Sequence, residues 1–161
     1  VETRLRKLSE GEFDAIVLAS ACLNRLGLAE HITELLDTER SIPAVGQGIV
    51  GIECRTADTR SRALTAVLND RTAETCITAE RAFARRLEGS CQSPIAGFAE
   101  LTGSLLTLRG MVGSMSGDQV FRGRVAGPAA TAASLGLNLA ERLLSDGADK
   151  LLEEMRAEAI P

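Results

Sequence analysis

The chain has 161 residues, of which 45% are apolar but only 2% aromatic, and its formal net charge is −4. This length and composition fit one or two small domains with an aliphatic core. The acidic balance and the absence of Trp and Tyr argue against nucleic-acid binding, which needs basic surfaces and aromatic stacking platforms. No apolar run approaches the roughly 20 residues that cross a membrane, so no membrane partner is expected.

The first 68 residues carry a mixed pattern of helices and strands. Apolar residues at helical spacing predict four helices, over 2–8, 21–26, 32–36 and 59–68. Continuous apolar runs predict two buried strands, over 15–18 and 48–54. Because two strands cannot close a sheet, we expect an incomplete α/β portion that resembles part of a hinged binding-protein domain. The start at Val1 rather than Met leads us to expect that the chain is part of a longer protein.

Residues 71–161 carry a different pattern. It predicts a long helix over 72–87, strands over 95–101, 105–112 and 120–125, and helices over 129–144 and 150–157. Gly-containing turns separate the three strands. This order predicts a small α+β domain in which helices cover one face of a three-stranded antiparallel sheet.

Cys91 lies between the long helix and the first of these strands. We expect Gly89 to end the helix, since Gly accepts the left-handed conformation common at helix C-termini. Pro94 prevents the helix from resuming. The thiol would then be displayed on a short loop for chemistry. Free cysteines are often inert packing residues, however, and the spacing alone leaves both interpretations open.

The other three cysteines fall within helical or strand patterns and are predicted to be packing residues; they are Cys22, Cys54 and Cys76. No Cys-x-x-Cys pair exists, and the single histidine, His31, is far from every cysteine in the sequence, so no metal site is expected. A chain with this much core does not need disulfides, and reduced thiols point to a cytoplasmic protein.

Three blocks of the sequence resemble one enzyme family. They are 13–19 with 24–28, the segment 42–55 with its Pro-Ala-Val-Gly-Gln-Gly run, and 81–96 around Cys91. In order and spacing they resemble the C-terminal half of porphobilinogen deaminase, also called hydroxymethylbilane synthase. Residues 1–68 would then correspond to pieces of the family's first two domains, and residues 71–161 to its C-terminal domain.

The resemblance implies a transferase of porphyrin, tetrapyrrole and heme biosynthesis. The complete enzyme, expected to be a cytoplasmic monomer, joins four porphobilinogen molecules into hydroxymethylbilane and releases ammonia. Its primer is a dipyrromethane cofactor bound through a thioether to the residue that matches Cys91. A thiolate suits this attachment, because it is a strong nucleophile for the electrophilic carbon that forms when porphobilinogen loses ammonia.

The resemblance also assigns carboxylate-binding residues. Each pyrrole carries an acetate and a propionate, and Arg4 and Arg25 match positions that bind these groups, while Gln47 matches a position that faces the cleft. Sixteen of the 18 basic residues are Arg, whose planar fork suits carboxylates. The base composition of a genome can produce the same excess, so the argument depends on these particular residues.

The chain departs from the family in a few places. Ser90 stands where the family has the second Gly of Gly-Gly-Cys, and Cys22 and Asn24 replace a glycine and a longer polar residue near Arg25. The family's catalytic aspartate belongs to N-terminal sequence that this chain does not contain. We therefore expect no catalytic residue in this chain, no activity from it alone, and a partnership with the enzyme's N-terminal half.

Two other functions remain open from the sequence. One is a non-enzymatic module that binds carboxylate ligands, and the other is a thiol redox or sensor domain that uses Cys91. A pyrrole attached covalently to Cys91 would distinguish the enzyme from both. The binding module would carry none, and the redox protein would instead show reversible oxidation of the thiol.

Overall fold

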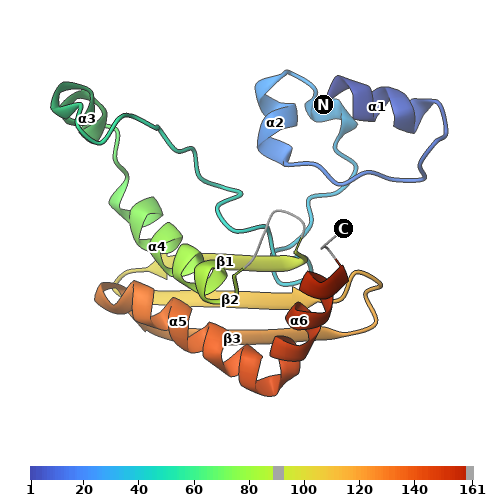
Figure 1. Ribbon diagram of the computed structural model, residues 1–161. Coiled ribbons are helices and arrows are strands. Elements are labelled where there is room, and N and C mark those ends of the chain that lie inside the picture. Colours follow the sequence, from blue (N-terminus) through green and yellow to red (C-terminus); the bar gives the residue numbers. More distant parts are fainter. Residues whose placement is uncertain (89–92, 159–161) are drawn as a thin grey trace. The chain divides into compact units, whose positions relative to one another are not determined.

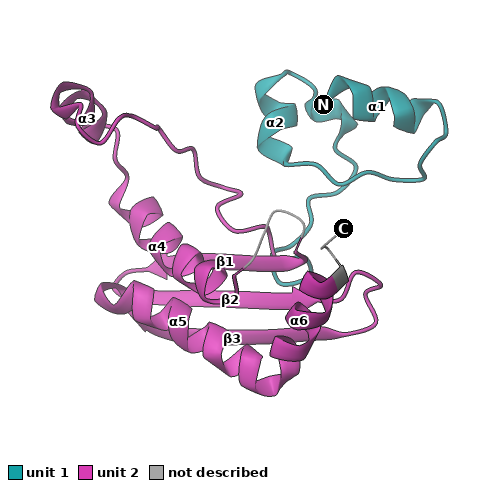
Figure 2. Ribbon diagram, in the orientation of Figure 1, with its two compact units in different colours: residues 1–41 teal, residues 42–161 magenta. Residues whose placement is uncertain are grey.

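The computed structural model describes residues 1–88 and 93–158 (Figure 1). The chain divides into two compact units, Val1–Ser41 and Ile42–Pro161, which Figure 2 distinguishes by colour. Compactness therefore groups residues 42–68 with the second unit, whereas the sequence pattern groups them with the first residues of the chain.

Unit 1 consists of two short helices and a helical turn joined by irregular chain. They are α1 (Glu2–Ser9), α2 (Ser20–Arg25) and the 3₁₀ turn η1 (Ala29–His31). The expected helices over 2–8 and 21–26 are therefore present. Within this unit, all of whose residues the structure describes, Leu23 is the only buried side chain. Unit 1 thus has almost no core of its own.

Two expected elements of unit 1 are wrong. Residues 15–18 form no strand, and residues 32–36 form no helix. A strand buried on both faces needs neighbouring strands, and the described residues of unit 1 supply none, so Val17 is 72% exposed. Residues 32–36 begin with the β-branched Ile32 and Thr33, which have low helix propensity. A helix of only five residues forms too few hydrogen bonds to offset the free-energy cost of nucleation.

Unit 2 begins with a long irregular segment that contains one helix. Helix α3 (Thr59–Ala66) starts at Asp58, whose carboxylate accepts hydrogen bonds from the backbone N–H (2.9 Å) and the hydroxyl (2.7 Å) of Ser61. The expected strand over 48–54 is absent, and Val50 is 89% exposed. No strand among the described residues pairs with this apolar run, so it stays in irregular chain.

The rest of unit 2, residues 71–158, forms a small α+β domain that we call the sheet domain. Its antiparallel strands are β1 (Ile95–Thr102), β2 (Leu105–Gly113) and β3 (Val120–Pro128), in the order β1-β2-β3. Its helices are α4 (Arg71–Arg86), α5 (Ala132–Leu143) and α6 (Asp149–Glu158). Helices α4 and α5 lie across one face of the sheet (Figure 1), which confirms the α+β fold predicted for this region.

Three glycines let these helices approach the sheet closely. Gly97, Gly110 and Gly123 are direct partners across the three strands. A Cβ on Gly110 would lie 2.5 Å from Cζ of Phe83 in α4, and one on Gly123 would lie 2.7 Å from Cδ1 of Leu139 in α5. The core therefore forms where aromatic and aliphatic side chains of the helices fill the space that these glycines leave.

The C-terminal end of α4 differs in detail from the expectation. The helix ends at Arg86, and Leu87 caps it. Glu88 takes the left-handed conformation, with φ of 53°, that we expected at Gly89; Gly89 lies outside the described residues. The Glu88 carboxylate pairs with Arg156 of α6 at 3.1 Å, a contact that helps to hold this conformation.

Candidate functional site

Cys91, the residue expected to carry the cofactor, lies outside the described residues, as does all of 89–92. The structure describes the two ends of that segment. On the α4 side, Leu87 is buried and its carbonyl accepts a hydrogen bond of 3.2 Å from Arg156. On the β1 side, the carbonyl of Pro94 accepts one of 2.9 Å from a backbone N–H of β2. Both ends are thus anchored in the sheet domain.

Gln47 lies in a turn within residues 43–48, a segment that we call the glycine loop. Gly46 takes a φ of 73°, the left-handed region that favours glycine. The N–H of Gln47 donates to the carbonyl of Ala44 at 3.0 Å, and the side chain of Gln47 is exposed. The turn therefore presents the Gln47 amide at the surface of unit 2.

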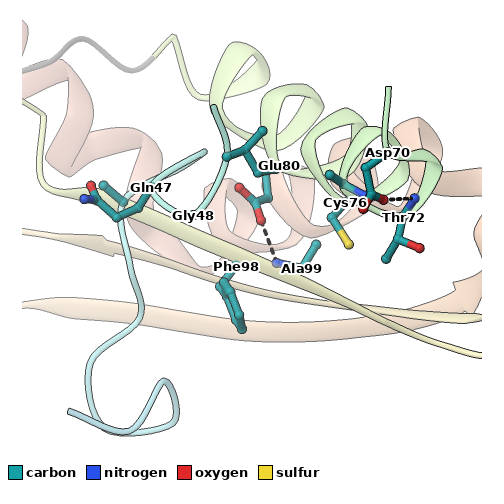
Figure 3. A pocket seen from close by; sticks show the side chains of 11 residues that line it. Gln47, Gly48, Asp70, Thr72, Cys76, Glu80, Phe98 and Ala99 are labelled. Atoms are coloured by element: carbon teal, nitrogen blue, oxygen red, sulfur yellow. Dashed lines mark hydrogen bonds between the residues drawn. The ribbon is translucent and has the colours of Figure 1, made fainter. Parts of the chain in front are cut away.

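The glycine loop, α4 and β1 together enclose a cavity of about 250 Å³ (Figure 3). Gln47 lines it from the loop, Cys76 and Glu80 from α4, and Phe98 from β1. Asp70 lies at the start of α4, where its carboxylate caps the helix by accepting the N–H groups of residues 72 and 73 at 2.8 and 3.0 Å. The cavity therefore has an apolar wall and a few polar groups.

Glu80 is the most buried charged side chain of this cavity, with 4% of its surface exposed. Its Oε2 accepts a hydrogen bond of 2.8 Å from the N–H of Gly46, and its Oε1 accepts one of 2.8 Å from the N–H of Ala99 (Figure 3). Burial raises the pKa of the Glu80 carboxyl above its ordinary value, and the two N–H donors act in the opposite direction. The carboxylate thus connects the glycine loop to β1.

Cys76 lines the same cavity but is not suited to chemistry. Its side chain is buried, and burial, followed by the nearby charge of Glu80, raises the pKa of the thiol. The prediction that Cys76 is a packing residue is confirmed. The same prediction is wrong for Cys22, which is exposed on α2, whereas Cys54 is half-buried.

Arg4 and Arg25 lie in unit 1, on α1 and at the end of α2, and both are exposed. Within the described part of the chain, neither takes part in an ion pair, whereas Arg6 pairs with Glu10 at 2.7 Å on the same helix as Arg4. Their guanidinium groups are therefore available to an external anion. A guanidinium group presents a planar set of N–H donors that suits a carboxylate.

Glu80 is the buried cavity residue that the sequence interpretation missed. A glutamate inside a helix ordinarily faces solvent. The spacing held a signal nonetheless, because Glu80 falls between Cys76, Phe83 and Leu87 on the buried face of α4. A charged residue at a core position of an amphipathic helix predicts a specific buried partner.

The structure also bears on membrane-spanning helices and on metal centres. Within residues 1–88 and 93–158, no helix is long and apolar enough to cross a membrane. The same residues hold no cluster of three or more His, Cys, Asp or Glu side chains that could bind a metal ion.

Comparisons with known proteins place both parts of the chain in one family. Residues 1–63 match the family model described as "Porphobilinogen deaminase, dipyromethane cofactor binding domain", and residues 74–145 match "Porphobilinogen deaminase, C-terminal domain". The chain is 48% identical over 155 residues to the porphobilinogen deaminase of Trichlorobacter lovleyi. That match covers 96% of this chain and 50% of the relative, so the chain spans about half the length of the curated relative. The chain belongs to the porphobilinogen deaminase family.

Proposed function

We propose that this chain provides the C-terminal part of a hydroxymethylbilane synthase, the transferase that joins four porphobilinogen molecules and releases ammonia. The observation that carries this proposal is the 48% identity to a porphobilinogen deaminase over 96% of the chain. The chain acts with the family's N-terminal sequence, supplied by the same polypeptide or by a separate one. That sequence holds the catalytic aspartate, and the complete enzyme works as a monomer in the cytoplasm.

The cofactor of this enzyme is dipyrromethane, and Cys91 is the residue that holds it through a thioether. The match of residues 1–63 to a cofactor-binding domain supports this assignment. When bound, the cofactor serves as the primer to which new pyrrole units are added. Cys91 keeps the growing chain attached to the protein, and the anchored ends of α4 and β1 support the segment that carries it.

Arg4, Arg25 and Gln47 bind the carboxylates of the primer and of the growing polypyrrole. Arg4 and Arg25 are exposed and, among the described residues, unpaired with any acid, so they can bind acetate and propionate without first breaking an ion pair. The Gln47 amide adds a neutral donor from the glycine loop. Three donors from separate elements suit a ligand that gains carboxylates as it grows.

In this proposal the chain has two functional parts, residues 1–68 and residues 71–161. The first part contributes to the cofactor and substrate cleft, and the second carries Cys91. The two family models support this division, because one ends at residue 63 and the other begins at residue 74.

The test is the covalent state of Cys91 in the complete enzyme. Intact-protein mass spectrometry should find a dipyrromethane adduct, and Ehrlich's reagent should give the pyrrole colour. Cys91→Ser should abolish both, while Cys22→Ser, the matched control at an exposed cysteine, should leave both unchanged. Colour that persists in Cys91→Ser would overturn the assignment.

The same experiment distinguishes the two other functions. A carboxylate-binding module would bind pyrrole acids reversibly and carry no adduct on Cys91. A thiol sensor would show a mass change at Cys91 that reductants reverse, because sulfenic acids and disulfides are reversible whereas a thioether is not.

A further inference from the structure

The free edge of β1 is covered by groups that do not belong to a strand. β1 is an edge strand of the sheet. Every second backbone N–H along it points away from β2 and has no partner strand. The N–H of Gly97 donates to the carbonyl of Pro43 at 3.1 Å, and that of Ala99 donates to Glu80 at 2.8 Å. The glycine loop and α4 therefore take the place of a fourth strand.

Glu80 is the side chain that joins these parts. Its two carboxylate oxygens accept one N–H each, from Gly46 of the glycine loop and from Ala99 of β1, and its backbone belongs to α4. One side chain thus connects three segments that are distant in the sequence. Only a carboxylate of this length can accept both bonds, because the Gln side chain has one acceptor oxygen and directs an N–H₂ group at the second donor.

Close packing reinforces the connection. A Cβ on Gly46 would lie 3.1 Å from Cδ1 of Ile77 in α4, and a Cβ on Gly97 would lie 3.1 Å from Cγ2 of Val45. The backbone of the glycine loop is therefore pressed against both α4 and β1. Beyond Ile49 the chain is irregular and exposed, as Val50 shows. Packing against α4 and β1 therefore holds the glycine loop, which carries Gln47, and not the chain that follows it.

We propose that Glu80 is a positioning residue that sets the placement of Gln47 relative to α4 and β1. Gln47 directly follows the Gly46 that Glu80 binds. Residues 89–92 lie between α4, which ends at Arg86, and β1, which begins at Ile95. The inference rests on the proposed function, in which Gln47 and Cys91 contact the same ligand. Glu80 itself need not touch that ligand, since it acts through the backbone of the loop.

The first arm of the test measures the connection without any ligand. Amide hydrogen exchange of the full 161-residue chain should be at least about tenfold faster at Gly46 or at Ala99 in Glu80→Gln than in the wild type, because Gln keeps only one of the two acceptor oxygens. The Gly113 amide, which donates to Pro94, should not change. Glu74→Gln, at an exposed position of the same helix, is the matched control and should leave both amides unchanged. Unchanged exchange at both Gly46 and Ala99 in Glu80→Gln would overturn the inference.

The second arm asks whether Glu80 acts through Gln47. In the complete enzyme, Glu80→Gln and Gln47→Ala should each lower kcat/KM by about tenfold, and the double variant should also lose about tenfold rather than about a hundredfold. A purely structural role of Glu80 predicts losses that multiply, and that result would overturn the inference. If Glu80→Gln does not fold, Gly46→Ala disturbs the loop from the other side and should show the same coupling to Gln47→Ala.

The two arms separate this inference from the proposed function. An enzyme that carries no adduct on Cys91 and makes no hydroxymethylbilane would refute the proposed function. The exchange measurement would still decide whether Glu80 holds the glycine loop. An enzyme that carries the adduct, with Gly46 and Ala99 amides that Glu80→Gln does not affect, would leave the function standing and refute the positioning role.

Discussion

The sheet domain and residues 1–70 both contain continuous apolar runs, but only the sheet domain buries them. Helices α4 and α5 pack on the sheet, and each element supplies fully buried side chains, such as Phe83, Leu139 and Leu108. The runs at 15–18 and 48–54 remain in irregular chain, and none of their side chains is buried. The difference shows that an apolar run becomes a strand only where the described chain also supplies its neighbours.

The largest expected effect is in hydrogen exchange along the isolated chain. Amides in the middle of β2 should exchange about a thousandfold or more slowly than those of residues 48–54, because only the former lie in a cooperatively folded sheet. Adding the N-terminal half of the family should slow exchange at 15–18 and 48–54 by pairing those runs. If the amides of β2 and of residues 48–54 exchanged equally slowly in a monomeric chain, the contrast between the sheet domain and residues 1–70 would be wrong.

Two phenylalanines test the same contrast in stability. Phe83 is completely buried and Phe13 is 49% exposed. In urea unfolding, Phe83→Ala should lower the free energy of unfolding by about 3–5 kcal/mol, since it leaves a cavity between α4 and the glycines of the sheet. Phe13→Ala should cost about 1 kcal/mol or less, which includes the loss of its contact with Lys7. Similar losses in the two variants would show that unit 1 has a core that the structure does not reveal.

The arginines of unit 1 should matter for activity rather than for stability. In the complete enzyme, Arg4→Leu and Arg25→Leu should each lower kcat/KM about tenfold or more, because a hydrogen bond to a charged group contributes about 1.5–3 kcal/mol. Arg6→Leu is the control: it removes only the exposed ion pair with Glu10, which contributes about 0.3–0.5 kcal/mol to stability. Unchanged steady-state kinetics in both Arg4→Leu and Arg25→Leu would identify them as solvated surface charges.

The smallest effect is the pH dependence that Glu80 gives to the sheet domain. Burial raises its pKa in the folded chain above the ordinary value of 4.5, so the folded chain holds this proton to a higher pH than the unfolded chain. The stability that protonated Glu80 contributes is fully present below pH 4.5, and it is lost as the pH rises through the pKa of Glu80 in the folded chain. The free energy of unfolding of the wild type, relative to Glu80→Gln, should therefore fall from pH 4.5 toward neutral pH. A difference that rises with pH over this range would show that the two N–H bonds outweigh burial.

The groups that face Glu80 do not reverse this expectation. The Cys76 thiol on α4 has a raised pKa and stays neutral over this range, and Asp70 at the start of α4 is present in both proteins, so it cancels in the difference. The glycine loop and Ala99 present backbone groups to the carboxylate rather than charged side chains.

The sheet domain was predictable from sequence because its partners are close along the chain. The strand expected over 105–112 is β2 with one further residue, and the helix over 72–87 is α4 displaced by one residue. The helix end was predicted less well, because Glu88 takes a left-handed conformation. A pattern that assigns such positions to glycine cannot anticipate a glutamate there, whose carboxylate pairs with Arg156.

The candidate site was predictable only in part. Gln47, Arg4 and Arg25 were chosen by resemblance, and their exposure agrees with binding but does not test it. Glu80 could have been found from its position on the buried face of α4, but its two N–H donors belong to residues 34 positions before it and 19 positions after it. Such distant backbone partners leave no periodic trace, which is why local reasoning did not single out the residue.

The covered edge of β1 has a consequence for how copies of this protein behave together. An exposed edge strand offers unpaired N–H and C=O groups to a second chain and is a common starting point of aggregation. Here the carbonyl of Pro43 and the carboxylate of Glu80 occupy the outward N–H groups of Gly97 and Ala99. The side chain that is proposed to position the glycine loop thus also blocks strand-by-strand stacking at this edge of the sheet.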